Sequence, residues 1–320
     1  MVKDLDKKQI VGIILFIIYL LGIVIITRYV LSDSETVYSL SNASTISISI
    51  GVLASFLSVV LVGVMDVTCS RVFGIRIEIT EAVAFTFVSA AINTFLPLQA
   101  GSVIKAYYYK KKSGLSYSKF VSVMAGTMIL NMIINLVCAL LSIVCVISRV
   151  DGLQSYIMPI CIIMICLILV VFWANVLRDV VIRITPLKKQ LLPIVNGYYE
   201  LMGSQKTVLL CSLNMILRNL LGGVRFLSIL YILGGMKDFP ISLMYCCVTN
   251  VSEMIPILPG NIGISEGIVG VINNQLFSRF DMGVAAVLIN RFFYYIALII
   301  GAIIFSAFVW IVYRKTKKEM

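Results

Sequence analysis

Long apolar stretches recur along the chain, and they constrain its fold more than any single motif does. Of its 320 residues, 60% are hydrophobic and only 13% are charged. A soluble domain carries roughly 25% charged residues, and one soluble core of this chain length cannot enclose the excess apolar side chains. Because a helix needs about 20 apolar residues to cross a bilayer, the sequence predicts an all-α polytopic membrane protein. Its six expected full spans are residues 10–31, 46–66, 119–148, 155–177, 207–234 and 283–313.

Two further apolar segments contain matched helix breaks, in which a glycine follows a proline by four residues. The first break, Pro97 to Gly101, lies in residues 82–108, and the second, Pro256 to Gly260, lies in residues 240–278. Interrupted apolar segments at corresponding places in two halves of a chain are the best sequence pointer to a transport site. The alternative interpretation is ordinary kinks, because Gly and Pro are frequent in membrane helices.

Basic residues set the expected orientation, because Lys and Arg concentrate in cytoplasmic loops. If residues 82–108 crossed the membrane once, the cluster Lys110 to Lys112 would lie outside. We therefore expect this segment to enter from the cytoplasm, break and return as a re-entrant hairpin, which is allowed where protein or water covers the broken backbone. By the same reasoning residues 240–278 enter from the opposite face. Both chain termini are expected in the cytoplasm of a multi-pass cell-membrane protein.

The expected order of spans and hairpins describes two inverted copies within a single membrane domain, residues 1–320. The first repeat covers about residues 46–148 and the second about residues 207–313. Residues 155–206 join them through one span and an amphipathic cytoplasmic segment. The opening apolar run, residues 10–26, is longer than the 7–15 residues of a signal-peptide core, so we expect a retained span.

Several kinds of chemistry find no support in the composition. The chain has no histidine, and its eight cysteines form no CxxC pair, so we expect no metal, cofactor or disulfide framework. The net charge of +11 is explained by topology and by anionic lipid headgroups. We expect no nucleic-acid partner, because no basic and aromatic recognition module is visible. Without a GxxxxGK[ST] motif, no ATP hydrolysis is expected.

The candidate substrate site combines the two breaks with charged and polar residues inside apolar segments. Intramembrane charges are costly and usually functional, and a helix break exposes backbone N–H groups that suit a phosphate. Arg218 and Arg225 are seven residues apart and share one helix face, where arginine can bind phosphate bidentately. Glu266 either pairs with Lys105 and holds the two hairpin tips together, or binds a headgroup amine, or carries a coupling proton. The full candidate set is Asn93, Pro97, Gly101, Lys105, Arg218, Arg225, Glu253, Pro259, Gly260, Gly263 and Glu266.

The sequence around both breaks resembles the two signatures of the lysylphosphatidylglycerol synthase transmembrane region, also called the flippase-like domain family. The first signature corresponds to residues 93–116 and the second to residues 256–267, and the resemblance extends over about residues 8–315. It implies movement of an anionic, aminoacylated or polyprenyl-linked lipid between leaflets. The chain departs from the family pattern at Gln99 and Ser102, where a base and an acid are usual.

Together these features favour a lipid flippase-like transporter, not an enzyme, with membrane lipids of anionic headgroup as partners. Two alternatives stay open: a membrane subunit that partners a separate lipid-modifying synthase, and a lipid-modifying membrane enzyme. Because the chain ends about seven residues after the last expected span, we expect no soluble aminoacyltransferase domain. The sequence leaves open a homo-oligomer, the particular lipid, the direction of transport and the energy source.

Overall fold

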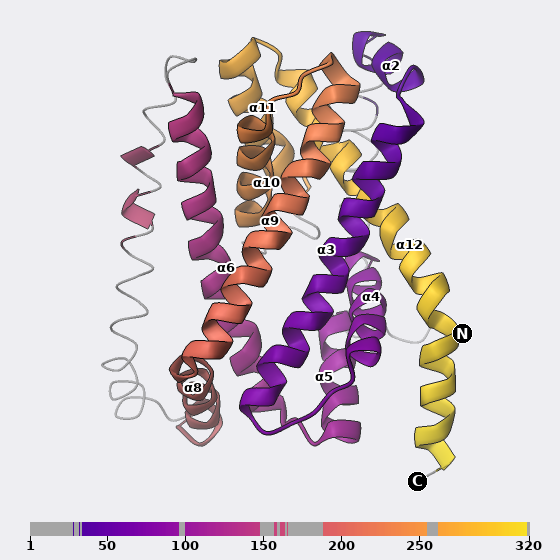
Figure 1. Ribbon diagram of the computed structural model, residues 1–320, viewed down its shortest axis with the longest axis vertical. Coiled ribbons are helices and arrows are strands. Elements are labelled where there is room, and N and C mark those ends of the chain that lie inside the picture. Colours follow the sequence, from indigo (N-terminus) through magenta and orange to yellow (C-terminus); the bar gives the residue numbers. More distant parts are fainter. Residues whose placement is uncertain are drawn as a thin grey trace, which may run out of the picture.

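The computed structural model describes most of the chain, and the regular elements in the described part are all helices (Figure 1). The described residues are 28, 32, 34–95, 100–147, 157–158, 161–163, 165, 188–254 and 262–318. Four helices in this part are long and apolar enough to cross a membrane, which confirms the predicted all-α polytopic membrane protein. They are α3 (Thr45–Val72), α6 (Tyr117–Val146), α9 (Gln205–Gly234) and α12 (Phe280–Lys318).

These four helices correspond to four of the six predicted spans. The other two predicted spans, residues 10–31 and 155–177, lie almost entirely outside the described residues. Two smaller helices complete the described part: α2 (Ser34–Ser41) precedes α3, and α8 (Lys188–Gly203) precedes α9.

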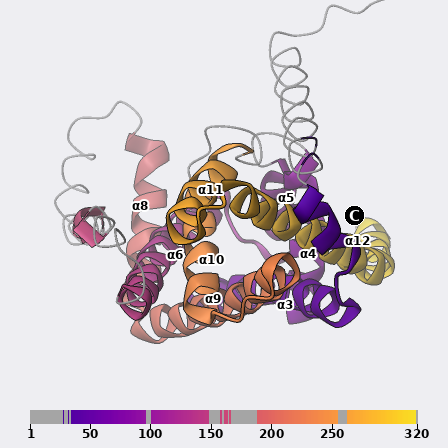
Figure 2. The ribbon, with the colours of Figure 1, turned by 90° about the horizontal axis from the view of Figure 1, so that it is seen from above.

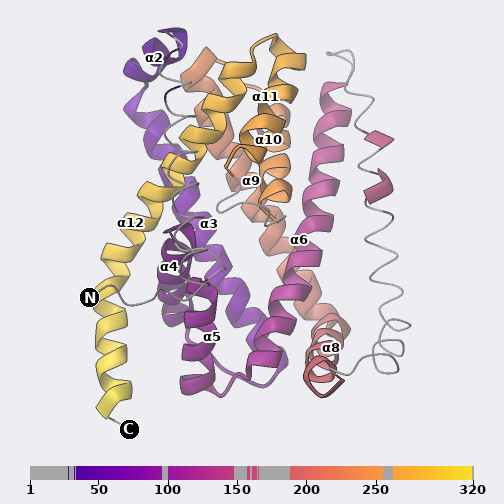
Figure 3. The ribbon, with the colours of Figure 1, turned by 180° about the vertical axis from the view of Figure 1, so that it is seen from behind.

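Four shorter helices form two hairpins at opposite ends of the molecule. The first hairpin consists of α4 (Ile79–Phe95) and α5 (Ala100–Ser113), and the second of α10 (Phe239–Glu253) and α11 (Ile264–Phe277). In Figures 1 and 3, α4 and α5 occupy the lower half of the molecule, whereas α10 and α11 occupy the upper half. In each pair, the first helix ends before a break predicted from proline and glycine, and the second helix begins at or after that break.

The order long, short, short, long occurs twice along the chain, as α3 to α6 and as α9 to α12. In Figure 1, α3 runs downwards and α9 runs upwards, so the two series have opposite directions. The view from above shows α3 and α9 next to each other, with α10 beside α6 and α9 (Figure 2). The two hairpins therefore extend toward the middle of the molecule from opposite ends.

Three buried apolar clusters lie among the described helices. One surrounds α10 and α11 and includes Phe226 and Tyr245, whose rings meet edge to face. A second joins α5 to α3, α6 and α9 and includes Tyr109 and Met215. A third joins α4 to α3 and α12 around Phe87. The second hairpin therefore packs in one cluster, whereas the two helices of the first hairpin pack mainly in different ones.

Short polar and glycine caps set the turn between α9 and α10. Gly235 ends α9 in the left-handed conformation, at φ 68°, which glycine adopts without the steric cost of a Cβ. Three residues later, the Asp238 side chain accepts a hydrogen bond from the backbone N–H of Ile241 at 3.2 Å and caps the N-terminus of α10. The turn folds α10 back along α9, and the Phe239 ring at the start of α10 lies 3.0 Å from where a Cβ would stand at Gly223.

Candidate functional site

Two arginines of α9 lie in the interior with unsatisfied donors. Arg218 is near the middle of this 30-residue helix, and Arg225 follows two turns later on the same face. Arg225 is only 8% exposed, and its contact with the Ser55 hydroxyl is a long 3.5 Å. In the described part of the chain, the buried Nε atom of each arginine has no hydrogen-bond partner. A buried charged donor without a partner raises the free energy of the folded protein. Binding of an anion to these two guanidinium groups would offset this cost.

Glu253 is the last residue of α10 and faces the same arginines. It interacts electrostatically with Arg291, Arg225, Glu266 and Arg218. It is exposed in the described structure. No hydrogen bond or ion pair joins it to another of the residues that the structure describes. Among the described residues, therefore, the Glu253 carboxylate forms no hydrogen bond or ion pair, and the same holds for the Nε atoms of Arg218 and Arg225.

Glu266, in contrast, is fully engaged. It lies in the first turn of α11 and is 2% exposed. One carboxylate oxygen accepts from the backbone N–H of Gly263 at 2.9 Å, and the other accepts from Nε of Arg291 at 2.8 Å. Gly263, at φ 89°, adopts the left-handed conformation at the start of α11. Of the three alternatives for Glu266, the pairing with Lys105 is therefore wrong: Arg291 of α12 is its partner, and the contact links α11 to α12.

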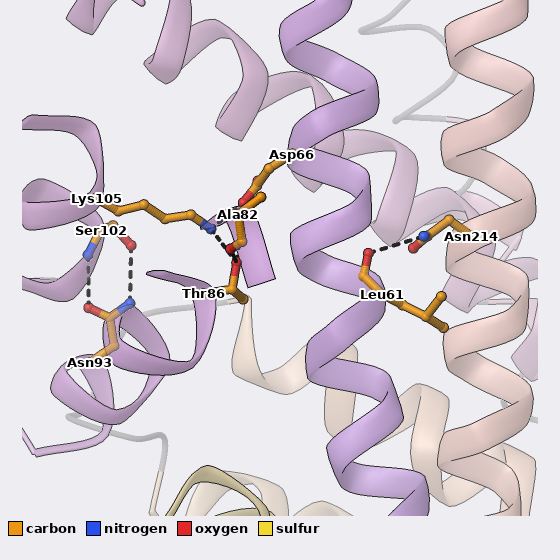
Figure 4. A network of polar contacts seen from close by, with 8 residues as sticks. All are labelled: Leu61, Asp66, Ala82, Thr86, Asn93, Ser102, Lys105 and Asn214. Carbon is orange, nitrogen blue, oxygen red and sulfur yellow. Dashed lines mark hydrogen bonds and ion pairs between the residues drawn. The ribbon is translucent and has the colours of Figure 1, made fainter. Parts of the chain in front are cut away.

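Lys105 lies in the first hairpin and has a different acidic partner. It is 6% exposed, forms an ion pair with Asp66 of α3, and donates to the Thr86 hydroxyl at 2.8 Å (Figure 4). Asp66 also acts electrostatically on Arg218.

Asn93 stabilises the start of the second helix of the first hairpin. Its carbonyl oxygen accepts from the backbone N–H groups of Gly101 at 2.8 Å and Ser102 at 3.3 Å, and its amide donates to the Ser102 hydroxyl at 3.1 Å (Figure 4). Gly101 also permits close packing, because a Cβ at this position would lie 2.0 Å from the carbonyl oxygen of Ser89. Both residues therefore shape the hairpin, and Asn93 already occupies the N–H groups that a phosphate would otherwise find at this end of α5.

A group of asparagines crosses three helices next to the arginines. Asn250 of α10 donates to the side-chain oxygens of Asn135 on α6 at 3.0 Å and of Asn219 on α9 at 3.1 Å. Such interhelical hydrogen bonds are the usual role of Asn within a membrane. The amide of Asn219 has no hydrogen-bond partner of its own among the described residues, so the group still offers a donor.

The structure brings together the later part of the predicted site and separates the earlier part. Arg218, Arg225, Glu253 and Glu266 lie close enough to interact electrostatically, together with Arg291, which was not in the predicted set. Lys105, Asn93 and Gly101 belong to the first hairpin. Pro97, Pro259 and Gly260 lie outside the described residues.

Three polar residues of the site were missed from the sequence. Asp66 and Asn219 lie in apolar stretches, and their polarity alone was a usable signal. Thr86 offered no such signal, because a threonine hydroxyl commonly donates a hydrogen bond to a backbone carbonyl of its own helix. The Thr86 hydroxyl also does so here, to the Ala82 carbonyl at 2.7 Å.

The charges in the cluster favour an anionic ligand. Three arginines, Arg218, Arg225 and Arg291, face two glutamates, Glu253 and Glu266, which leaves an excess of one positive charge. Arginine presents several donors in a planar fork that matches the oxygens of phosphate or carboxylate. The charge balance and the shape of the guanidinium groups therefore suit binding of a singly charged anion.

Comparison with known proteins identifies a family. Curated proteins and solved structures give no significant match to the chain. The family model described as the lysylphosphatidylglycerol synthase TM region matches residues 9–302, nearly the whole chain. The match includes α3 to α11 and most of the hydrophobic part of α12, hence every residue of the arginine and glutamate cluster. The protein therefore belongs to the lysylphosphatidylglycerol synthase transmembrane region family.

Proposed function

We propose that the protein is a flippase-like transporter that moves a lipid with an anionic headgroup between membrane leaflets. One observation carries the proposal: the Nε–H groups of Arg218 and Arg225 are buried without a hydrogen-bond partner in the described part of the chain. A phosphate diester would satisfy both guanidinium groups and balance the excess positive charge. The family description, which names a lipid-modifying synthase, supports a lipid as the source of that phosphate.

The opposed hairpins supply a route to this site from either leaflet. In our proposal, α4–α5 and α10–α11 are re-entrant hairpins that enter the membrane from opposite faces. Such half-helices, with their tips near the bilayer midplane, are common in secondary transporters. Basic residues gather at the end of the molecule that carries the α3–α4 loop and the end of α5, namely Arg71, Arg76 and Lys110 to Lys112. By the positive-inside rule, we take this end as cytoplasmic.

The substrate class follows from what the arginines can recognise. Anionic phospholipids, aminoacylated phospholipids and polyprenyl-linked lipids all carry a phosphate next to their apolar chains. The acyl chains need no enclosed pocket, because they stay in the bilayer while the headgroup passes between the hairpins. Recognition by phosphate alone predicts a preference for anionic over zwitterionic lipids, since the trimethylammonium group of phosphatidylcholine would be repelled by the net positive cluster.

Leaflet exchange in proteoliposomes tests the proposal. Fluorescent phosphatidylglycerol is incorporated in both leaflets, and dithionite then bleaches only the outer leaflet. We expect bleaching to run to completion with the wild-type protein and to stop near half with Arg225→Gln, which keeps a donor but loses the charge. Arg76→Gln is the matched control, because Arg76 is exposed in the α3–α4 loop and its replacement leaves exchange unchanged.

The opposite results point to the other candidate functions. Equal exchange by the wild type and Arg225→Gln would reject the arginine site. Absence of exchange with every lipid tested, in protein that stays folded and monodisperse, would favour a membrane subunit that partners a synthase. Chemical modification of the lipid during the assay would favour a membrane enzyme.

A further inference from the structure

Asn219 of α9 has a buried amide of which only one end is used. The residue is 1% exposed, and its side-chain oxygen accepts from the amide of Asn250 on α10 at 3.1 Å. This hydrogen bond fixes the orientation of the Asn219 amide, because its oxygen must face Asn250. The Nδ2 group of Asn219 has no hydrogen-bond partner among the described residues. A buried donor without an acceptor raises the free energy of the folded protein, and an oxygen atom of a ligand would offset this cost.

The side chains next to Asn219 do not supply that oxygen. Asn250 donates to the side-chain oxygen of Asn135 at 3.0 Å and to the sulfur of Cys246 at 3.5 Å, so these groups are already engaged with each other. The Cys138 thiol of α6 lies near the Asn219 amide, but a thiol sulfur is a weak acceptor. An oxygen acceptor would therefore be a better partner for Asn219 than any side chain around it in the described part of the chain.

Asn219 directly follows Arg218 on α9, and both residues lie beside α10. Gly222, about one turn further along α9, packs closely on α10, because a Cβ at this position would lie 2.1 Å from the sulfur of Cys246. Consecutive side chains on a helix point about 100° apart, so a group of a few ångströms between them contacts both. Arg218 and Asn250 are only partly buried, so this level of α9 is accessible to a ligand.

Three buried N–H groups without a partner therefore belong to α9, namely Nε of Arg218, Nδ2 of Asn219 and Nε of Arg225. All three are donors, so a ligand that satisfies them must offer several acceptor oxygens. The two charged oxygens of a phosphate diester suit the two guanidinium groups. The neutral amide of Asn219 is left for an uncharged oxygen, such as that of a hydroxyl group. An ammonium group has donors only and cannot fill this role.

We propose that Asn219 selects the lipid headgroup by donating a hydrogen bond to a hydroxyl oxygen of a glycerol or sugar attached to the phosphate at Arg218 and Arg225. The proposal rests on the transport function proposed above and narrows its substrate class to phospholipids with hydroxylated, uncharged headgroups. Lipids with ethanolamine or aminoacyl headgroups are disfavoured, because their ammonium group would lie beside a cluster with an excess positive charge.

Two lipids that differ only in hydroxyl groups test the proposal. Dihexanoyl phosphatidylglycerol and dihexanoyl phosphatidylpropanol have the same charge and the same acyl chains, but the propanol headgroup has no hydroxyl. Each is titrated into the purified full-length protein in neutral detergent, and calorimetry gives the two affinities. For the wild type we expect phosphatidylglycerol to bind about tenfold more tightly, the effect of one buried donor left without its hydrogen bond.

Substitutions assign this preference to a residue. Asn219→Leu keeps the approximate size of the side chain and removes the amide, so we expect it to bind the two lipids alike while the arginines still bind the phosphate. Asn196→Leu is the matched control, because Asn196 is exposed on α8, and this variant keeps the preference. If Asn219→Leu fails to fold, Asn219→Ala must lose the preference in its place.

The ratio of the two affinities separates headgroup recognition from a purely structural role. If Asn219 only holds α9 against α10, the variants bind both lipids more weakly and the ratio stays as in the wild type, which overturns the proposal. Equal affinities in the wild type overturn recognition of a hydroxyl and leave the phosphate site intact. Binding of dihexanoyl phosphatidylethanolamine as tight as that of phosphatidylglycerol overturns the narrower substrate class. No binding of any of these lipids, together with no leaflet exchange, rejects the proposed function itself.

Discussion

Replacing Glu266 by glutamine tests the contact that links the second hairpin to α12. The substitution keeps the shape of the side chain and an oxygen that can accept from the backbone N–H of Gly263. It removes the charge that faces Nε of Arg291 at 2.8 Å. The side chains of Glu266 and Arg291 are only 3% and 11% exposed, so water cannot replace the lost partner. The guanidinium group is left buried without its counter-ion.

The expected loss of stability is large for a single substitution. Removing one partner of a buried ion pair costs about 3–5 kcal/mol. Because Glu253 also interacts electrostatically with Arg291, part of the charge stays balanced, and we expect the lower end, about 3 kcal/mol. Each kcal/mol lowers the Tm of a domain of about 150–250 residues by roughly 2–4 °C, so the Tm falls by about 6–12 °C.

Thermal unfolding in detergent micelles, followed by tryptophan fluorescence, measures this change. A double-mutant cycle with Arg291→Met isolates the pair, since the double variant buries neither charge. We expect the double variant to be less destabilised than the sum of the single variants by about 1–3 kcal/mol. A Tm of Glu266→Gln within about 2 °C of the wild type, or additive effects in the cycle, would refute the reasoning.

Two further predictions concern helix packing. Gly101→Ala places a Cβ 2.0 Å from the Ser89 carbonyl oxygen and should lower stability by about 3 kcal/mol, the upper range for overpacking. Gly267→Ala meets nothing within 4 Å and should be neutral or slightly stabilising, so similar melting temperatures for the two variants would contradict the close packing. Cys69 of α3 and Cys211 of α9 lie with their sulfur atoms 3.5 Å apart, so copper phenanthroline should oxidise them to a disulfide. Mass spectrometry of the digested protein should then show a disulfide-linked peptide pair that dithiothreitol separates. If both thiols stay free after oxidation, the close approach of α3 and α9 at these two residues is contradicted.

The helix breaks could be predicted because their signals are local. Proline and glycine act on the backbone within a few residues, and α4 ends at Phe95 and α5 begins at Ala100, on either side of Pro97. The pairing of α4 with α5 followed from the positions of lysine clusters along the chain. Neither signal depends on which helices are neighbours in the fold.

The partners of the buried charges could not be predicted, because they depend on long-range packing. Lys105 meets Asp66, and Glu266 meets Arg291. Hydropathy ended the second span at residue 66, which placed Asp66 at the membrane edge. The helix continues to Val72, so the carboxylate lies more than a turn inside the helix, where Lys105 reaches it. The sequence identifies the charges that need partners, but not which partner each of them meets.

The buried ion pair between Lys105 and Asp66 has a consequence for biogenesis. With 14 residues and a buried lysine, α5 cannot partition into lipid alone. The acidic partner of Lys105 is Asp66 on α3, which is synthesised before α5. Likewise, Glu266 on α11 is synthesised before its partner Arg291 on α12. In both ion pairs the basic residue is made after the acid that neutralises it. We therefore expect α3 to remain beside the insertion machinery until α5 arrives, and α11 until α12 arrives.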